Sequence, residues 1–466
     1  MLSEIVNLDE YDNIKLLEEL ENRNILKEIN HTNRISVAFT HSKLREYIYM
    51  IQPDSKKKVL HKKIGEIFES RLKRNKKTPY IYSKLVYHFG KSGEQLKTLK
   101  YKIETLNYYL SFSHELFPIL TIQESEKENI YISRDKINEI FQDIMENFKD
   151  LHAADSSEDL NLLEMEFFYM KGRYFIRDGN YKDGLNDIRY VINKAREMGN
   201  QDYIIEGYKQ FIFYDIQTNN PKEMIEYIEL ALDLAVKRNY HKEIGILLRL
   251  KGLYNMMIGN YYTAEQLLNE SINTLTVTKE VANKYSINIA AAYNYIGELR
   301  KSTGKYEEAI EMFKSAIKLS KDKNALSSLS IFYINIGKTY FSLNDLINSK
   351  KYFNAAYSLY GQFDSFWKRT VLDAYMALTE LRLENYNDAL YHMTNALNMV
   401  DTMKDPRDVG TVNFAMYYIS NFVDENKEIE SLFKEILTEN TLHYRDEAIK
   451  YLDEHRDVFE LDILKA

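Results

Sequence analysis

Small and apolar residues recur with a spacing of about forty positions from residue 184 onward. The recurring positions are Gly184, Met224, Ala264, Ala309, Ser349, Ala389 and Ile429, with successive gaps of 40, 40, 45, 40, 40 and 40 residues. A large apolar residue follows each of them by four positions, and another residue of the same face follows by seven. Such offsets lie on one side of an α-helix. A fixed period of 20 to 50 residues is typical of a solenoid of stacked repeats.

Glycine and tyrosine positions indicate that each period is a helical hairpin. Glycine inside a helix costs about 1 kcal/mol against alanine, so its presence predicts a close crossing of the two helices. The glycines inside expected first helices are Gly252, Gly297 and Gly337. Glycines between helices, where a positive φ is useful, are Gly179, Gly259 and Gly304. The residues expected to open second helices are Tyr181, Tyr261, Tyr306 and Tyr386.

One period resembles the tetratricopeptide repeat closely. Its matching positions are Gly297, then Gly304-Lys305-Tyr306-Glu307-Glu308-Ala309, then Phe313 and Ala316. The resemblance implies an all-α, right-handed solenoid of about seven or more hairpins, where the usual repeat has about 34 residues. A 40-residue period predicts helices longer by about a turn and a half per hairpin.

The resemblance also implies a concave face, lined by the first helix of each hairpin. The candidate ligand-binding residues on it are Tyr169, Arg173, Lys209, Phe213, Arg249, Met256, Asn294, Glu298, Lys338 and Phe341, with Lys301 at a further position of the same face. Apolar anchors mixed with cationic and amide groups suit an extended peptide or a helix. The alternative is that these side chains pack against the adjacent repeat.

Residues 1–50 lack the repeat. The pattern predicts a helix over Asp9–Asn22 and two short strands, Ile25–Ile29 and Ile35–Phe39, joined by a polar loop. Ser42 is expected to cap a following helix that runs through Tyr49. Helix, hairpin and helix together form the back half of a winged helix.

A basic amphipathic helix is expected next. Residues 56–77 hold ten Lys/Arg and two acids, and the basic patch comprises Lys56, Lys57, Lys58, Lys62, Lys63, Arg71, Lys73 and Arg74. Residues 1–100 carry a net charge of +7 and the remainder −15, which together give the −8 of the whole chain. The simplest interpretation is a solvated face. Binding of an acidic partner or of nucleic acid is the alternative.

A second resemblance begins at Phe39. The stretch Phe39-Thr40-His41-Ser42-Lys43-Leu44-Arg45-Glu46, with Tyr49, is similar to a motif of bacterial STAND-class signalling ATPases. In that family a nucleotide-binding domain precedes a winged helix and a tetratricopeptide sensor, so the chain corresponds to the end of the winged helix plus the sensor. No G-x-x-x-x-G-K-[ST] phosphate loop occurs in the sequence. Gly337-Lys338-Thr339 is expected inside a repeat helix, so we expect no nucleotide binding by this chain.

Catalytic and metal chemistry find little support. The chain has no Cys, which excludes disulfides and Cys-ligated metal and favours a reducing cytoplasm. The ten His are scattered without zinc-site spacing. His455-Arg456-Asp457 resembles part of a kinase catalytic loop, but Asp462 stands where that loop has Asn. We therefore expect no enzyme activity, cofactor or metal.

These observations predict four regions. They are a partial winged helix (1–50), a basic helix with irregular helical repeats (51–160), the solenoid (161–440) and a polar capping helix (441–466). The expected function is a non-catalytic sensor or scaffold of a bacterial cytoplasmic signalling or transcriptional regulator. It would bind a protein or peptide in the groove, with an N-terminal NTPase domain in cis or in trans. The alternatives are a free-standing adaptor, a peptide-pheromone receptor, or nucleic-acid binding through residues 56–77.

Overall fold

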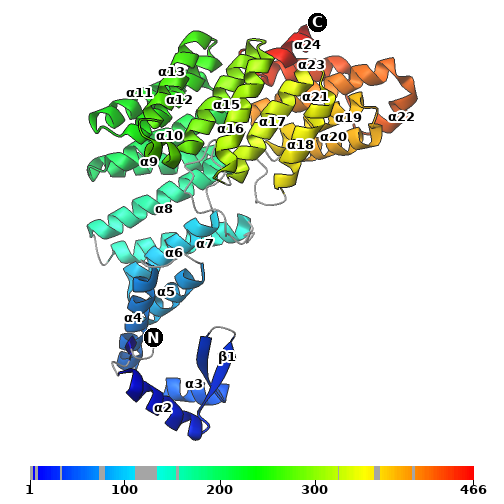
Figure 1. The fold of residues 1–466 in the computed structure, drawn as a ribbon. Coiled ribbons are helices and arrows are strands. Elements are labelled where there is room, and N and C mark those ends of the chain that lie inside the picture. The colour runs from blue at the N-terminus through cyan, green and yellow to red at the C-terminus, as the bar shows by residue number, and fades with distance from the viewer. Residues whose placement is uncertain are drawn as a thin grey trace. The chain divides into compact units, whose positions relative to one another are not determined.

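The computed structural model describes residues 4–5, 9–31, 34–72, 79–110, 134–153, 157–323, 325–360, 368–400 and 405–466. These residues form two compact units, here called the N-terminal unit, which ends at Glu164, and the repeat unit, which begins at Met165. Both are mostly helical (Figure 1). None of the described helices combines the length and the apolar character needed to cross a lipid bilayer. The four-region division stays a prediction.

The N-terminal unit opens with the expected helix, hairpin and helix. Its elements are α2 (Glu10–Asn22), β1 (Leu26–His31), β2 (Arg34–Phe39), α3 (Ser42–Met50), α4 (Asp54–Leu72), α5 (Pro79–Ser92), α6 (Gln95–Leu110) and α7 (Arg134–His152). The strands pair antiparallel, with Leu26 opposite Phe39. Asp9 caps α2 by accepting a hydrogen bond from the Asp12 amide at 2.8 Å. The expected cap by Ser42 is wrong, because α3 already begins at Ser42 and its cap residue is His41.

Ion pairs partly neutralise the basic helix α4. Lys57 Nζ lies 3.2 Å from Asp54 Oδ1, Arg71 Nη2 lies 3.1 Å from Glu4 Oε2, and Lys62 pairs with Glu94. Lys56 and Lys58 are exposed, whereas Lys63 is half-buried. Lys73 and Arg74 lie outside the described residues. The apolar side of α4 joins a small core around Leu85, Phe89 and Tyr101.

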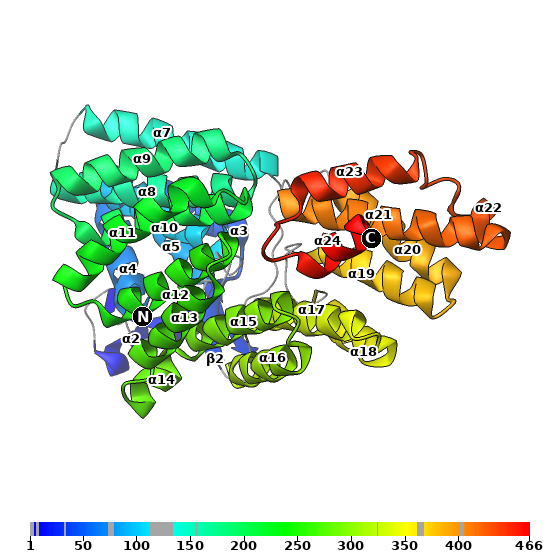
Figure 2. The same ribbon diagram turned by 90° about the horizontal axis from the view of Figure 1, so that it is seen from above.

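The described part of the repeat unit consists of seven hairpins followed by two C-terminal helices. Its helices are the end of α8 (Glu158–Arg177), α9 (Tyr181–Glu197), α10 (Gln201–Gln217), α11 (Pro221–Lys237), α12 (His241–Met257), α13 (Tyr261–Leu275), α14 (Lys279–Lys284), α15 (Ser286–Ser302), α16 (Tyr306–Lys321), α17 (Leu326–Ser342), α18 (Leu346–Tyr360), α19 (Arg369–Arg382), α20 (Tyr386–Val400), α21 (Pro406–Glu425), the 3-10 turn η2 (Lys427–Ile429), α22 (Glu430–Phe433), α23 (Thr441–Tyr451) and α24 (Val458–Lys465). Figure 2 shows these helices following a curve. The additional helix α14 explains the single 45-residue gap.

The periodic residues form the packed seam of the solenoid. All seven recurring small or apolar positions are buried, and the seven residues four positions later are fully buried. Of the residues seven positions later, only Ile436 is not buried, and it follows the short helix α22 of the last hairpin. The expected hairpin solenoid is confirmed, and the four tyrosines open their second helices as predicted.

Close helix crossing accounts for the glycines of the first helices. A Cβ on Gly297 would lie 2.6 Å from the ring of Phe313, and one on Gly337 would lie 2.5 Å from the ring of Phe353. Both rings come from the second helix of the same hairpin, at the position four residues after the seam residue. The turn glycines Gly179, Gly259 and Gly304 have φ of 78°, 76° and 74°. In degenerate turns Asn219 and Asn344 take the same left-handed conformation.

We expect Gly337→Ala to destabilise the repeat unit by about 1–2 kcal/mol, because crowding of the Phe353 ring outweighs the gain in helix propensity. The control is Gly90→Ala in α5, where an added Cβ meets the Thr98 side chain at ordinary distances of 3.7 Å (methyl carbon) and 4.0 Å (hydroxyl oxygen). That change should be neutral or stabilising by up to about 1 kcal/mol. Urea unfolding followed by circular dichroism measures both. Equal effects of the two substitutions would contradict the close-crossing account.

Candidate ligand-binding groove

Most of the predicted groove residues are buried between helices. The buried ones are Tyr169, Lys209, Phe213, Arg249, Met256, Asn294 and Phe341, whereas Arg173, Glu298 and Lys338 are partly exposed. The buried polar side chains can form ion pairs between helices of neighbouring repeats, as Lys209 does. Lys209 Nζ bridges Glu206 at 2.6 Å and Glu243 at 2.8 Å, and thereby joins α10 to α12. Ligand contact by the ten residues stays a prediction, and the partly exposed three have the best access to a ligand.

A cavity of about 100 Å³ opens on the face made by the first helices. It brings together two of the predicted residues, Glu298 and Lys338, with the further position Lys301. The other predicted residues do not line it. Its remaining wall is formed by Ile216, Leu253, Tyr295, Phe313, Ile331, Ile334, Asn335, Lys368, Val371, Asp405, Arg407, Asp408, Thr411, Arg456 and Asp457. The cavity thus draws on helices from six consecutive hairpins, α10 to α21, and on the C-terminal residues.

Charged groups dominate one side of this cavity. Lys368 Nζ lies 2.6 Å from Asp405 Oδ2 and 2.5 Å from Asp408 Oδ1. Burial raises the pKa of Asp408 to about 6, while Lys368 acts to lower it. Burial disfavours the charged form of Lys301 in the same way, and for this amine it lowers the pKa below its ordinary value. These desolvated charges are costly unless each faces a partner of opposite sign.

Several charged residues of the cavity wall were not predicted from their positions in the repeat. Lys368 precedes α19, and Asp405 precedes α21, so neither lies at a first-helix position of the repeat pattern. Arg407 and Asp408 belong to the first turn of α21, in a hairpin beyond those from which the groove residues were predicted. The charged run Lys404-Asp405-Pro406-Arg407-Asp408 ahead of an apolar helix was the available signal.

The C-terminal residues, expected as one polar capping helix, form two helices joined by a buried turn. We call residues 452–465, which comprise this turn and α24, the C-terminal segment. The turn closes on Asp453, whose carboxylate accepts hydrogen bonds from the amides of His455 at 3.0 Å and Arg456 at 2.9 Å. Arg456 Nε also donates to Asp453 Oδ2 at 3.0 Å. Asp453, Arg456, Asp457 and Glu460 are all buried rather than solvated.

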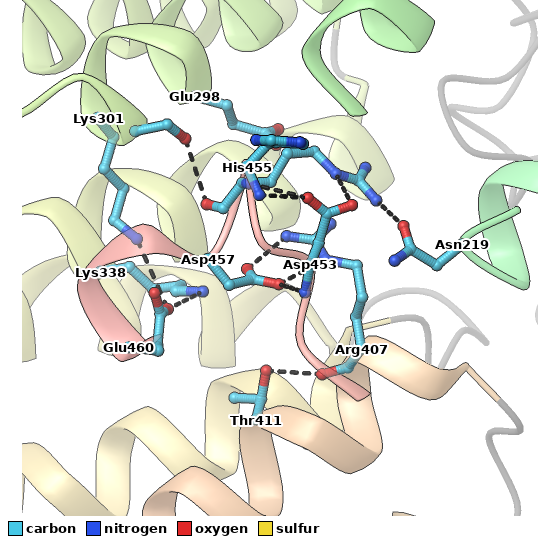
Figure 3. A network of polar contacts seen from close by, with 12 residues as sticks. Asn219, Glu298, Lys301, Lys338, Arg407, Thr411, Asp453, His455, Asp457 and Glu460 are labelled. Carbon is cyan, nitrogen blue, oxygen red and sulfur yellow. Dashed lines mark hydrogen bonds and ion pairs between the residues drawn. The ribbon is translucent and has the colours of Figure 1, made fainter. Parts of the chain in front are cut away.

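Carboxylates of the C-terminal segment meet cations of the first helices (Figure 3). Arg407 donates through Nε to Asp457 Oδ2 at 2.9 Å and through Nη2 to Oδ1 at 2.6 Å. Glu460 Oε1 lies 2.9 Å from Lys338 Nζ and 3.6 Å from Lys301 Nζ, and also accepts a hydrogen bond from the Tyr375 hydroxyl. The bidentate pair fixes geometry as well as charge.

The surroundings keep both carboxylates ionised. Burial acts to raise the pKa of Glu460, but Lys301 and Lys338 outweigh it and lower the pKa to about 2. Burial also opposes the charge of Asp457, and Arg407 holds its pKa well below the usual range. The segment is therefore attached in its charged form.

Sequence comparison identifies the repeats. The family model of the tetratricopeptide repeat matches residues 290–323 and 331–363, which cover hairpins α15–α16 and α17–α18. These two hairpins of the solenoid are tetratricopeptide repeats. A search of curated proteins finds no match to its sequence.

Solved structures share the fold of these tetratricopeptide repeats. A STAND protein with a tetratricopeptide repeat sensor from Pyrococcus horikoshii aligns with TM-score 0.56 and 13% identity, over 98% of this chain and 62% of the other. The chain thus spans less than two thirds of that protein. A Rap protein complexed with competence and sporulation factor aligns with TM-score 0.51 and 13% identity, over 88% and 98% of the chains. The apo form of the quorum sensor NprR from B. thuringiensis gives TM-score 0.50 and 14% identity, over 88% and 99%.

Acid should loosen the attachment of the C-terminal segment to the solenoid, whereas small changes in pH near neutrality should not. The pKa of Glu460 is lowered from 4.5 to about 2 on docking, so its contribution is complete above pH 4.5 and is lost as the pH falls towards 2. For one such group this amounts to on the order of 3 kcal/mol. Hydrogen exchange of residues 453–465, corrected for the intrinsic rate, should show constant protection between about pH 8 and 5 and less below about pH 4.

Glu460→Gln should reduce that dependence on pH. Protection that falls between about pH 8 and 6 instead would contradict the assignment, because a group with a pKa near neutrality, such as a histidine or Asp408, would then control docking in place of Glu460.

Proposed function

We propose that the first-helix face of the repeat unit binds a peptide or an extended protein segment, and that this binding is the sensing event of a cytoplasmic regulator. The observation that carries the proposal is the charged cavity on this face. Its wall carries the donors of Asn335 and of Lys338 and Arg407, which hold Glu460 and Asp457, together with the apolar side chains of Leu253 and Ile334. Polar groups that fix orientation beside apolar anchors are characteristic of peptide sites.

The structural neighbours support this proposal by analogy of fold. One is a Rap protein in complex with competence and sporulation factor, and another is a quorum sensor. A third carries its tetratricopeptide repeats as the sensor of a STAND protein. For this chain the analogy favours a ligand-responsive role, in which the output is an NTPase domain acting in cis or in trans. Fold alone does not assign function, so the weight rests on the site.

A change in solenoid curvature is the proposed signal. Apart from the contacts of the C-terminal segment, the helices of each hairpin pack on those of its neighbours, so small rotations at successive interfaces add along the unit. A ligand that touches α15, α17, α19 and α21 together would favour the curvature in which all four are in reach. The glycines of the first helices, such as Gly297 and Gly337, restrict such adjustment to rotations that keep the two helices of a hairpin closely packed.

The proposal is tested by selecting peptides from a random 12-residue display library on the immobilised full-length chain. The selected peptides should slow hydrogen exchange in α15, α17, α19 and α21 but not in the second helices α16, α18 and α20. Lys338→Ala should weaken their binding by about tenfold or more, because one charge-assisted hydrogen bond is lost.

The matched control is Lys351→Ala on the second helix α18, where the side chain is exposed. Binding should be unchanged in this variant. Selected peptides that bind both lysine variants like the unmodified chain, or that protect the second helices instead, would contradict a groove on the first-helix face. Failure to select any peptide would also count against the proposal.

A further inference from the structure

The C-terminal segment contacts the repeat unit as a bound ligand would. Besides its ion pairs with Lys301, Lys338 and Arg407, its backbone carbonyls accept hydrogen bonds from side chains next to the turns of two hairpins. Tyr261 donates its hydroxyl hydrogen to the His455 carbonyl at 2.7 Å, and Ser302 Oγ donates to the Arg456 carbonyl at 3.2 Å. Arg456 also reaches Asn219 at the end of α10. Residues distant in sequence thus hold one short stretch of chain.

Apolar contacts complete this arrangement. The ring of Phe459 lies with its edge towards Phe341, with centroids 6.3 Å apart, and Leu461 and Leu464 are buried. The His455 imidazole packs directly on the turn glycine Gly259, where an added Cβ would lie 2.8 Å from its Cε1 atom. Figure 2 shows α24 on the inner side of the curve formed by α15, α17, α19 and α21.

We propose that the C-terminal segment is a built-in competitor for the groove, and that the external ligand is an acidic peptide with the same spacing of groups. That spacing is two carboxylates one helical turn apart, as in Asp457 and Glu460, with an aromatic or aliphatic residue beside the second, as in Phe459 and Leu461. This inference rests on the proposed function and specifies its ligand class. The C-terminal segment and the peptide compete for the same site, so only one of them occupies the groove at a time.

Charge explains why exchange is feasible. The cations Lys301, Lys338 and Arg407 are desolvated at this site, so leaving them without carboxylates is strongly unfavourable. If carboxylates of a peptide replace those of the C-terminal segment, each of the three cations keeps a partner of opposite charge. Glu460 Oε2 accepts no hydrogen bond from the described residues. A ligand carboxylate that satisfies both of its oxygens would therefore compete effectively.

The experiment uses the full-length chain carrying Asp457→Asn and Glu460→Gln, which keeps the size of both side chains and removes their charges. The probe is a fluorescent synthetic peptide with the sequence of residues 452–466, measured by fluorescence polarisation. We expect it to bind this double variant about ten to a hundred times more tightly than the unmodified chain. An occluded groove lowers apparent affinity by the fraction of molecules in which it is open.

Two exposed acids of the same segment provide the matched control. Glu454→Gln with Asp462→Asn removes the same charge without touching the groove cations, because both side chains face solvent. This control should bind the probe like the unmodified chain. A further Lys338→Ala substitution in the Asp457→Asn, Glu460→Gln chain should weaken the gained binding by about tenfold, since it removes a charge-assisted contact.

A second measurement does not depend on the folding of any variant. In the unmodified chain, an excess of the probe labelled with 15N should accelerate hydrogen exchange in residues 453–465 of the protein, which its mass distinguishes from the probe. Unchanged exchange with saturating probe would overturn the exchange mechanism. Equal probe affinity for the unmodified chain and the double variant would overturn it as well.

The outcomes also separate this inference from the proposed function. If library-selected peptides bind the first-helix face but the 452–466 probe does not bind the double variant, the built-in competitor is refuted and the groove stands. If neither binds, both are refuted. Probe binding that produces dimers in size-exclusion chromatography would show that the segment serves another copy of the chain, which refutes intramolecular competition.

Discussion

Close crossing of two helices, once in every forty residues, is the constraint on which the structure depends. A residue without a side chain, or with a small one, lets the second helix place a large apolar group against the first. In the best-formed hairpins this is a glycine beneath a phenylalanine ring, as at Gly297 and Gly337. The contact fixes the angle within a hairpin, and repetition of the angle sets the curve of the solenoid. Groups on the first helices consequently face a common interior.

The interior gathers charges that would be unfavourable without partners. Lys301, Lys338, Lys368 and Arg407 come from different hairpins, and carboxylates of the same chain satisfy them. Asp405 and Asp408 do so for Lys368, while Asp457 and Glu460 do so for the others. Compared with apolar side chains of similar size, buried ion pairs add little stability, but they select strongly for a partner of the right charge and geometry. The C-terminal segment shows that carboxylates one helical turn apart fit this surface.

The sequence predicted the architecture because packing leaves a periodic signal. The seam positions, the turn glycines and the opening tyrosines could all be read from spacing alone. The helix start at Ser42 was misplaced by one residue, since a serine inside the first turn and a serine at the cap look alike in sequence. The residues of the candidate site were harder to predict from the sequence. Positions such as Lys209 and Arg249 appeared suitable for ligand contact, but ion pairs and packing between neighbouring repeats bury them. Contacts between Arg407 and Asp457 join residues fifty positions apart, and no repeat pattern specifies that pairing.

An experimental structure of the full-length chain with a selected acidic peptide tests the central claim most directly. The account predicts the peptide along α15, α17, α19 and α21, with one carboxylate between Lys301 and Lys338 and another on Arg407. The C-terminal segment should then have left these positions. A peptide bound elsewhere, with Glu460 still on Lys338 and Asp457 still on Arg407, would contradict the claim.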